Sequence, residues 1–281
     1  MEIVKYIKFV SLVVVLLMGN QAFAQDTQPN IIVILCDDLG YADVGFNGSK
    51  DIVTPNLDKL AHDGTIFTSA YVAHPFCGPS RAALLTGRYP HVIGAPFNLR
   101  DDGVPTNDGV PVTETFMSEV LQSSGYYTGI VGKWHLGYAN QFHPNQRGFD
   151  NFYGFLGGGH DYFPDKFRPM YEQQVKEGKS PIRVYIQPLE QNGKPVNETE
   201  YVTDGLSREA INMVKEASAK KKPFFLYLAY NAPHVPLQAK EEDMAKFKNI
   251  EDLDRRTYAA MVYAVDRGVG NLVKTLKETT L

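Results

Sequence analysis

Residues 31–36, Ile31-Ile32-Val33-Ile34-Leu35-Cys36, form an uninterrupted apolar run that is followed at once by the pair Asp37-Asp38. A short run rich in β-branched side chains is typical of a strand that is buried on both faces, as in a parallel sheet. Comparable runs occupy 126–131 and 224–230, and a further strand candidate covers Thr65 to Val72. The first run therefore predicts a central strand of an α/β sheet.

Helical patterns alternate with these runs. They predict helices over Asn56–Asp63, 79–86, Thr113–Ser124, Thr203–Lys220 and Asp254–Glu278. Residues 150–200 are rich in glycine, proline, aromatic and charged residues, and we expect long surface loops and a hairpin there. The alternation predicts an α/β fold in which helices sandwich a large, mostly parallel sheet.

The first residues have the order of a secretory signal. Lys5 and Lys8 precede an apolar run from Phe9 to Met18, and the small-residue pattern Ala22-Phe23-Ala24 follows. This predicts a signal peptide over 1–24 and one domain over 25–281, in an exported chain that is periplasmic or secreted. A membrane anchor is the alternative, but the run has about half of the roughly 20 residues that span a bilayer. We therefore expect no stable membrane span.

Charge and cysteine content narrow the function classes. The formal net charge is −4, and loss of 1–24 would change it to −5 because that segment carries two lysines and one glutamate. Such a mild negative excess disfavours nucleic acid as a partner. Two cysteines do not make a disulfide framework, although Cys36 and Cys77 could pair in an oxidising compartment.

Several chemically active residues follow predicted strands. Asp37-Asp38, Lys133 to His135 and His234 come just after apolar runs, and Cys77 follows the candidate strand Thr65 to Val72 after a short loop. Because the carboxyl ends of parallel strands meet at one edge, we expect these side chains to gather there, where open α/β sheets bind ligands.

The aspartate pair and the cysteine each have an ordinary explanation. Adjacent buried carboxylates need a compensating cation such as calcium or magnesium, but a solvated turn or a helix cap explains an isolated pair better. Cys77 begins a predicted helix with Arg81 one turn later, a positive environment that favours a thiolate or a bound anion. A lone buried cysteine is more often structural, and lone residues such as Lys133, His135 and His234 are more often solvated or structural. We expect Trp134 to pack in the core or to form a pocket wall.

The residues around Cys77 resemble the signature of the sulfatase family. That signature is Cys-x-Pro-Ser-Arg followed by Thr-Gly-Arg, and it stands here as Cys77-Gly78-Pro79-Ser80-Arg81 and Thr86-Gly87-Arg88. Further motifs of the family occur in the expected order: Asp37-Asp38-Leu39-Gly40-Tyr41, Thr54-Pro55-Asn56-Leu57-Asp58, Gly132-Lys133-Trp134-His135-Leu136-Gly137, Gly148-Phe149-Asp150 and Ala232-Pro233-His234-Val235-Pro236. The likeness covers residues 30 to 280 and implies an alkaline phosphatase-like fold.

The resemblance assigns a role to each residue of the predicted site. Cys77 would be oxidised by a maturation enzyme to formylglycine, whose hydrate attacks sulfur and later expels sulfate. The metal ligands would be Asp37, Asp38 and residue 77, and the ion would be Ca2+, with Mg2+ less favoured. Arg81 would steady the formylglycine, Lys133 and His234 would bind the sulfate, and His135 would take a proton during elimination. A disulfide would consume the thiol that must be oxidised, so Cys36 is better explained as a core residue.

The family pattern continues beyond what this chain carries. A later Asp-Asn pair, a further lysine and a smaller C-terminal subdomain are absent from the sequence, so we expect the chain alone to be weakly folded or inactive. The favoured substrate is a sulfated small molecule or glycan, because the neighbourhood of Gly154 to Gly158 is similar to that of sugar sulfatases. The alternatives are a phosphonate or phosphate monoester hydrolase of the same superfamily, or a truncated relative that acts as a binding protein.

Overall fold

The structure, a computed structural model, describes residues 28–99, 106–179, 185 and 187–279. The predicted signal peptide over residues 1–24 lies outside the described residues. A six-stranded sheet has the order β1-β6-β2-β3-β4-β5, in which the first three pairings are parallel and the last two are antiparallel. The bounds of the strands are β1 Ile31–Asp37, β2 Tyr127–Lys133, β3 Asn151–Phe155, β4 Leu189–Gln191, β5 Lys194–Val196 and β6 Phe224–Pro233. The predicted α/β fold with a mostly parallel sheet is confirmed.

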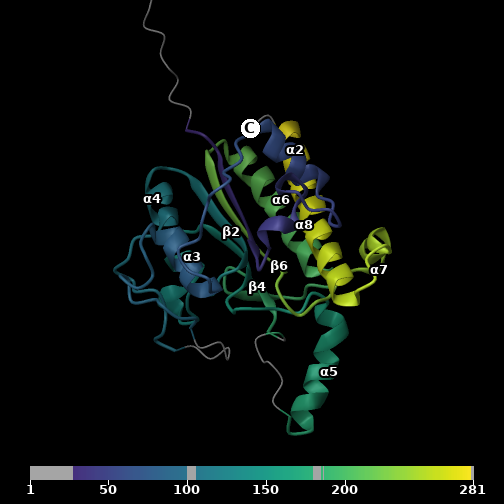
Figure 1. Cartoon of the computed structure of the whole chain (residues 1–281). Coiled ribbons are helices and arrows are strands. Elements are labelled where there is room, and N and C mark those ends of the chain that lie inside the picture. The colour runs from purple at the N-terminus through teal and green to yellow at the C-terminus, as the bar shows by residue number, and fades with distance from the viewer. Residues whose placement is uncertain (1–27, 100–105, 180–184, 186, 280–281) are drawn as a thin grey trace, which may run out of the picture.

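Helices cover both faces of the sheet (Figure 1). One face carries α3, Cys77–Thr86, and α4, Met117–Ser123; the other carries α2, Pro55–Asp63, α6, Val202–Lys220, and α8, Leu253–Glu278. The short helix α7, Glu241–Met244, contacts α8, whereas α5, Pro164–Lys176, projects away from the body. Among the described residues, no helix is long and apolar enough to cross a membrane.

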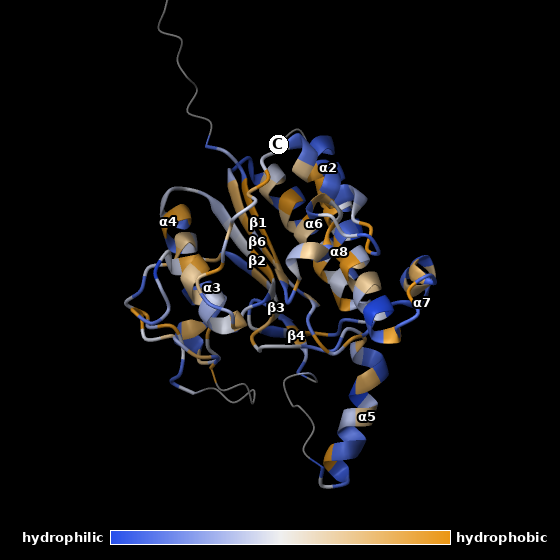
Figure 2. Ribbon diagram, in the orientation of Figure 1, coloured by the Kyte–Doolittle hydropathy of each residue, from blue (hydrophilic) through white to orange (hydrophobic). Residues whose placement is uncertain are grey.

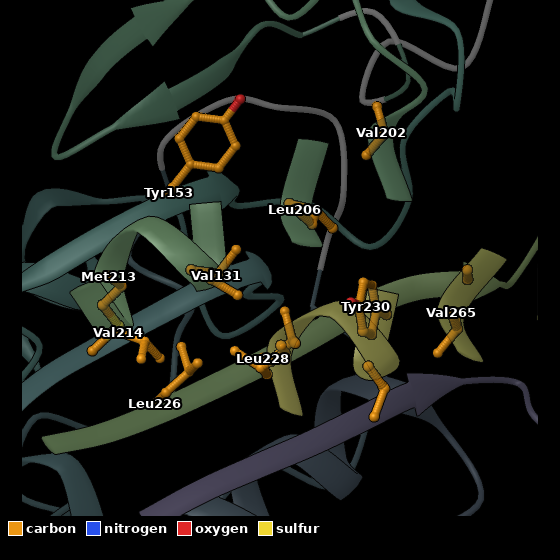
Figure 3. Packing of buried hydrophobic residues seen from close by; sticks show 14 of the residues in the cluster. Val131, Tyr153, Val202, Leu206, Met213, Val214, Leu226, Leu228, Tyr230 and Val265 are labelled. Atoms are coloured by element: carbon orange, nitrogen blue, oxygen red, sulfur yellow. The ribbon is translucent and has the colours of Figure 1, made fainter. Parts of the chain in front are cut away.

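The central strand β6 has an apolar sequence because both of its faces are buried. Phe225, Tyr227 and Ala229 pack beneath α3, whereas Leu226, Leu228 and Tyr230 pack on the α6 and α8 side. Figure 2 shows the resulting apolar strands between the two helical layers. Figure 3 shows Leu226 and Leu228 close to Met213 and Val214 of α6. Burial of each larger apolar side chain contributes about 1.5–3 kcal/mol, so apolar packing stabilises both helical layers on the sheet.

Local signals place the ends of the helices near the site. Pro79 lies in the first turn of α3, where its missing N–H removes no hydrogen bond, and Gly87 ends the helix with φ at 66°. α8 begins after Asp252, whose side chain accepts a 2.7 Å hydrogen bond from Arg255 N. Cys77 therefore stands at a helix N-terminus, as predicted.

Three sequence predictions differ from the structure. The strand predicted over Thr65 to Val72 is wrong: these residues form no strand, and Phe67 and Tyr71 are 76% and 91% exposed because no neighbouring element of the described residues covers them. The helix predicted from Thr113 begins only at Met117. The hairpin in residues 150–200 is confirmed as β4 and β5, but this region also contains β3 and α5, which were not predicted.

The edge strand β1 is less well covered than its sequence suggests. Within the described residues it pairs with β6 alone, and its residues from Ile31 to Cys36 are only half-buried. Tyr71 and Val72 line, together with Leu35, a cavity of about 580 Å³ that the middle and end of α3 also line. This face of the sheet is therefore open.

The start of α2 is anchored from α8 rather than by its own N-cap. The buried carboxylate of Asp266 accepts hydrogen bonds from Asn56 N at 2.9 Å, Leu57 N at 2.8 Å and Asn56 Nδ2 at 2.8 Å. Thr54 provides no side-chain cap. The motif from Thr54 to Asp58 is therefore held in place by a contact between α2 and α8, which cover the same face of the sheet.

We predict that Asp266→Ala lowers the free energy of unfolding by about 2 kcal/mol, because the N–H groups of Asn56 and Leu57 lose their buried acceptor. Asp63→Ala at the end of α2 is the control, since its exposed carboxylate faces Lys59 at 3.7 Å, and it should cost less than about 0.5 kcal/mol. Urea unfolding followed by circular dichroism measures both. Equal losses for the two variants would contradict the anchoring role of Asp266.

Candidate active site

Three strands end side by side at one edge of the sheet. Asp37 is the last residue of β1, Lys133 is the last of β2, and Pro233 is the last of β6, which lies between them. α3 begins at Cys77 beside the same edge. The expectation that Asp37-Asp38, Cys77, Lys133 to His135 and His234 gather at the carboxyl ends of the strands is confirmed by the contacts below.

The carboxylate of Asp37 lies between two buried cations. Lys133 donates a hydrogen bond to Asp37 Oδ2, and Arg81 Nη2 is 3.6 Å from the same oxygen. The exposed fractions are 0% for Lys133, 1% for Arg81 and 6% for Asp37. Burial alone would raise the pKa of Asp37, but the charges of Arg81 and Lys133 outweigh it and hold that pKa below its ordinary value. Two cations against one carboxylate leave one positive charge in excess, which suits an anionic ligand.

Arg81 is fixed on one side and unsatisfied on the other. Its Nη1 donates to the carbonyl oxygen of Lys133 at 2.8 Å and to the Tyr227 hydroxyl at 3.4 Å. Its Nε and Nη2 are buried and make no hydrogen bond to any described residue. Buried donors without an acceptor are rare in folded proteins, so this guanidinium is available to a ligand or to water.

The side chain of Cys77 lies between an imidazole and an amide. Its Sγ is 3.3 Å from His135 Nδ1 and 3.7 Å from Asn98 Oδ1. Burial lowers the pKa of His135 to about 3, and the charges of Lys133 and Arg81 act in the same direction. The imidazole is therefore neutral near pH 7, so one of its ring nitrogens can accept a proton.

Asp38 and His234 form the exposed side of the site. Asp38 has a left-handed backbone with φ at 61°, and its carboxylate is 63% exposed. His234 Nε2 is 3.7 Å from Asp38 Oδ2, while Nδ1 is 2.6 Å from the carbonyl oxygen of Val235. The hydroxyl of Tyr258 on α8 accepts from Gly40 N at 3.1 Å, and its single proton faces two acceptors, the Asp38 carbonyl oxygen at 3.1 Å and Asp43 Oδ2 at 3.0 Å. The α8 helix thus fixes the backbone that carries Asp38.

The donor set at this edge fits a hard cation in kind. Asp37 and Asp38 supply the carboxylate oxygens that calcium prefers. Within the described part of the chain, however, no three side chains of His, Cys, Asp and Glu form a group that could hold a metal ion. Two carboxylates are fewer than the six to eight oxygen ligands of calcium, so the described residues provide only part of such a site.

A cavity of about 210 Å³ joins these elements. Its lining includes Asp37 and Asp38 from β1 and its exit, and Cys77 and Arg81 from α3, with His74 and Phe76 at the approach to α3. The volume is below the range of about 300–1,000 Å³ that is typical of drug-sized ligands. The cavity therefore suits a small charged group at the end of a larger ligand.

Comparison with known proteins assigns the chain to a family. The family model described as Sulfatase matches residues 29–281. The chain belongs to the sulfatase family. Among curated relatives, mouse N-acetylgalactosamine-6-sulfatase is 34% identical over 275 residues, which are 95% of this chain and 50% of the relative. Dog arylsulfatase G is 34% identical over 90% of this chain and 49% of its own length. This sulfatase chain spans about half the length of the curated relatives it matches.

Solved structures agree with this assignment. A crystal structure of Ps i-CgsB in complex with k-i-k-neocarrahexaose is 64% identical, with a TM-score of 0.86 over 90% of this chain and 56% of that one. The PsFucS1 sulfatase from Pseudoalteromonas sp. is 29% identical, with a TM-score of 0.76 over 93% of this chain and 54% of that one. The fold of the sulfatase chain is therefore the alkaline phosphatase-like fold.

Sequence patterns did not single out three residues that shape this sulfatase site. Asn98 contacts Cys77 from a distant loop, Tyr258 holds the backbone of Asp38, and the hydroxyl of Tyr162 donates to the carbonyl of His234 at 2.7 Å. Each acts across a long sequence separation through one polar atom, so no local periodicity reveals it. Gln238 adds a second link, because its Oε1 accepts from Tyr162 N at 2.9 Å.

Two residues have the structural roles expected of them. Trp134 is fully buried, and its Nε1 donates to the carbonyl of Phe142 at 2.9 Å. Cys36 is a free, half-buried residue that packs against the α6 and α8 side of the sheet, and burial raises the pKa of its thiol to about 12. Both cysteines of the sulfatase chain are free.

Removal of Lys133 should destabilise the sulfatase chain strongly. Lys133→Ala leaves the buried Asp37 with Arg81 alone, and we expect the free energy of unfolding to fall by about 3 kcal/mol. Lys220→Ala, which breaks an exposed pair with Glu216 on α6, should cost less than about 0.5 kcal/mol. Urea midpoints measure the difference. The double variant Asp37→Asn, Lys133→Met should recover part of the lost free energy of unfolding, because the carboxylate that loses Lys133 is then replaced by a neutral amide. A double variant less stable than Lys133→Ala would contradict the charge argument.

Proposed function

We propose that the native polypeptide containing this chain hydrolyses sulfate esters, with formylglycine made from Cys77 as its nucleophile. The observation that carries the proposal is the position of Cys77 at the N-terminus of α3, 3.3 Å from His135 Nδ1 and beside the buried cluster of Asp37, Lys133 and Arg81. That cluster has one positive charge in excess, which matches the single negative charge of a sulfate ester.

Hydrated formylglycine explains the choice of residue. One hydroxyl of the hydrate would lose its proton as its oxygen bonds to sulfur, the bond from sulfur to the ester oxygen would break, and the leaving oxygen would take up a proton, so that the alcohol leaves neutral. The second hydroxyl then gives its proton to His135, the aldehyde forms again, and the bond from residue 77 to sulfate breaks. A serine would instead remain blocked as a stable sulfate ester.

The charged side chains act on sulfate and on the leaving group. Arg81 holds residue 77 through the first turn of α3 and offers unsatisfied donors, while Lys133 neutralises sulfate charge. His234, beside Asp38 at the exposed side, lies where a leaving oxygen can take a proton. Nε2 of His135 is buried without a partner among the described residues, so the proton that His135 takes up would leave through Nδ1, on the side of residue 77.

The cofactor of the proposed reaction is calcium, with magnesium the less favoured ion. Asp37, Asp38 and residue 77 would hold it, together with ligands from outside the described residues. When bound, it supplies Lewis-acid polarisation of a sulfate oxygen. The proposed partners are the sulfated substrate and a maturation enzyme that makes formylglycine. The order of residues 1–24 supports an exported, periplasmic or secreted polypeptide.

The proposed substrate is a sulfated oligosaccharide of the carrageenan type. The neocarrahexaose complex of Ps i-CgsB supports this, because that protein is 64% identical over 90% of this chain. The cavity of about 210 Å³ admits a sulfate group and not a whole sugar chain, so the sugar would lie across its mouth. The N-acetylgalactosamine-6-sulfatases, at 34% identity, support a hexosamine sulfate less strongly.

We predict sulfate release from neocarrahexaose by the matured native polypeptide, and its loss by about a thousandfold in Cys77→Ala because the nucleophile is gone. A calcium chelator should lower the rate by about tenfold or more, and added calcium should restore it. Ion chromatography of free sulfate measures all three. Ser123→Ala is the control, since Ser123 is exposed on α4, where its hydroxyl donates to the carbonyl oxygen of Val120, and its loss should not affect the rate.

Mass spectrometry of the Cys77 peptide separates this proposal from that of a binding protein. An aldehyde at residue 77, with a mass lower than that of the thiol, is expected from a host that matures sulfatases. An unmodified thiol together with tight binding and no release of sulfate would favour the binding protein instead.

A panel of esters tests the substrate class. We expect kcat/KM for neocarrahexaose to exceed the values for N-acetylgalactosamine 6-sulfate and for an aryl phosphate by about tenfold or more, because binding along a longer sugar adds transition-state contacts. The phosphate carries a second negative charge that the excess charge of the cluster does not match. Faster turnover of phosphate or phosphonate esters would move the chain to the monoester hydrolases of this superfamily.

A further inference from the structure

Asn98 lies against the start of α3 although it is 21 residues away from Cys77 in the sequence. Its Oδ1 accepts a hydrogen bond from Gly78 N at 3.0 Å and lies 3.7 Å from Cys77 Sγ. The residue is exposed, whereas His135, on the other side of the thiol, is 4% exposed. Asn98 therefore stands on the solvent side of residue 77, from which an ester must enter.

The first turn of α3 depends on this contact. The N-cap residue is Phe76, which provides no side-chain cap, so the N–H of Gly78 would otherwise lack a side-chain acceptor. A Cβ at position 78 would lie 3.0 Å from Asn98 Oδ1 and 3.5 Å from the carbonyl oxygen of His135. Gly78 thus lets both neighbours approach the helix start closely.

The hydrogen bond to Gly78 also fixes the orientation of the amide. Only the oxygen of an asparagine amide can accept from a backbone N–H, so Oδ1 is the atom that faces α3 and residue 77. An amide oxygen has two lone pairs, and here one meets Gly78 N–H while the other is directed at the side chain of residue 77. The side chain at 77 is therefore placed between Asn98 Oδ1 and His135 Nδ1, and Nδ1 is also an acceptor in the tautomer that carries the ring proton on Nε2.

We propose that Asn98 is a positioning residue for the nucleophile: anchored on Gly78, its amide oxygen accepts a hydrogen bond from the side chain of residue 77 and holds that side chain toward His135. This inference rests on the proposed sulfatase function for its catalytic meaning. A hydrated formylglycine has two hydroxyl groups, and the two acceptors give each of them a separate partner. One hydroxyl is then kept near His135, where its proton is needed for elimination, instead of rotating freely.

Kinetics of Asn98 variants test the proposal in the matured native polypeptide. We expect Asn98→Ala to lower kcat by about 10- to 100-fold with KM changed by less than about threefold, because a misplaced reacting group costs rate more than binding. Asn98→Asp keeps the acceptor oxygen and should retain more of kcat than the alanine variant. The yield of formylglycine at residue 77 should be the same in all variants.

Asn192→Ala is the matched control. Its Oδ1 also accepts from a backbone N–H, that of Phe152 at 2.8 Å, and it is exposed in the β4–β5 hairpin away from the site. If both alanine variants change kcat equally at a temperature where both are folded, the positioning role is overturned. A wild-type polypeptide that carries formylglycine and releases no sulfate would instead overturn the proposed function.

A second measurement needs no enzymatic activity. In the unmatured protein, alkylation of Cys77 by iodoacetamide at fixed pH should become several-fold faster in Asn98→Ala, since the thiol loses the neighbour on its solvent side. Cys36 in the same digest is the folding control, because its thiol packs against the core and burial raises its pKa to about 12, so it should stay unalkylated while the chain is folded. An unchanged Cys77 rate relative to Asn192→Ala would overturn the contact on which the inference rests.

Discussion

The buried carboxylate of Asp37 is the constraint on which the site depends. A lone carboxylate at the end of a core strand would be costly, and Lys133 and Arg81 compensate it from β2 and α3. The ion pairs therefore join three elements that are far apart in sequence. Since Arg81 also bonds to the carbonyl of Lys133, the end of β2 and the first turns of α3 cannot move independently. These contacts therefore fix the position of Cys77 at the start of α3.

The second layer, formed by α8, fixes what lies beyond the strand ends. Tyr258 holds the backbone of Asp38 and Gly40, and Arg255 pairs with Asp43 and Asp51 in the loop that follows. Asp266 holds the start of α2. A single long helix thus organises residues 38–58, so the exposed carboxylate of Asp38 sits on a backbone that is rigid although its side chain is solvated.

Sequence reasoning succeeded where the signal was local. The apolar runs of β1 and β6, the proline and glycine at the two ends of α3, and the order of polar residues after the strands all depend on near neighbours, and they predicted the sheet and the gathering of the site. The strand predicted over Thr65 to Val72 failed because β propensity alone does not form a strand without a neighbouring strand to pair with. α5 was missed because its polar sequence, with Pro169 inside, has no core face to reveal it. Asn98 and Tyr162 were missed because their polar contacts reach residues far away in the sequence, which sequence periodicity does not encode.

Within the described residues, strand β1 forms one edge of the sheet and pairs with β6 alone. An edge strand presents a row of unpaired N–H and C=O groups, and natural proteins usually protect such edges with charge, proline or a covering element. The run from Ile31 to Cys36 contains none of these charges or prolines. Within the described residues, the outer edge of β1 therefore carries backbone groups that a further strand could pair with, whether that strand comes from the native polypeptide or from another molecule.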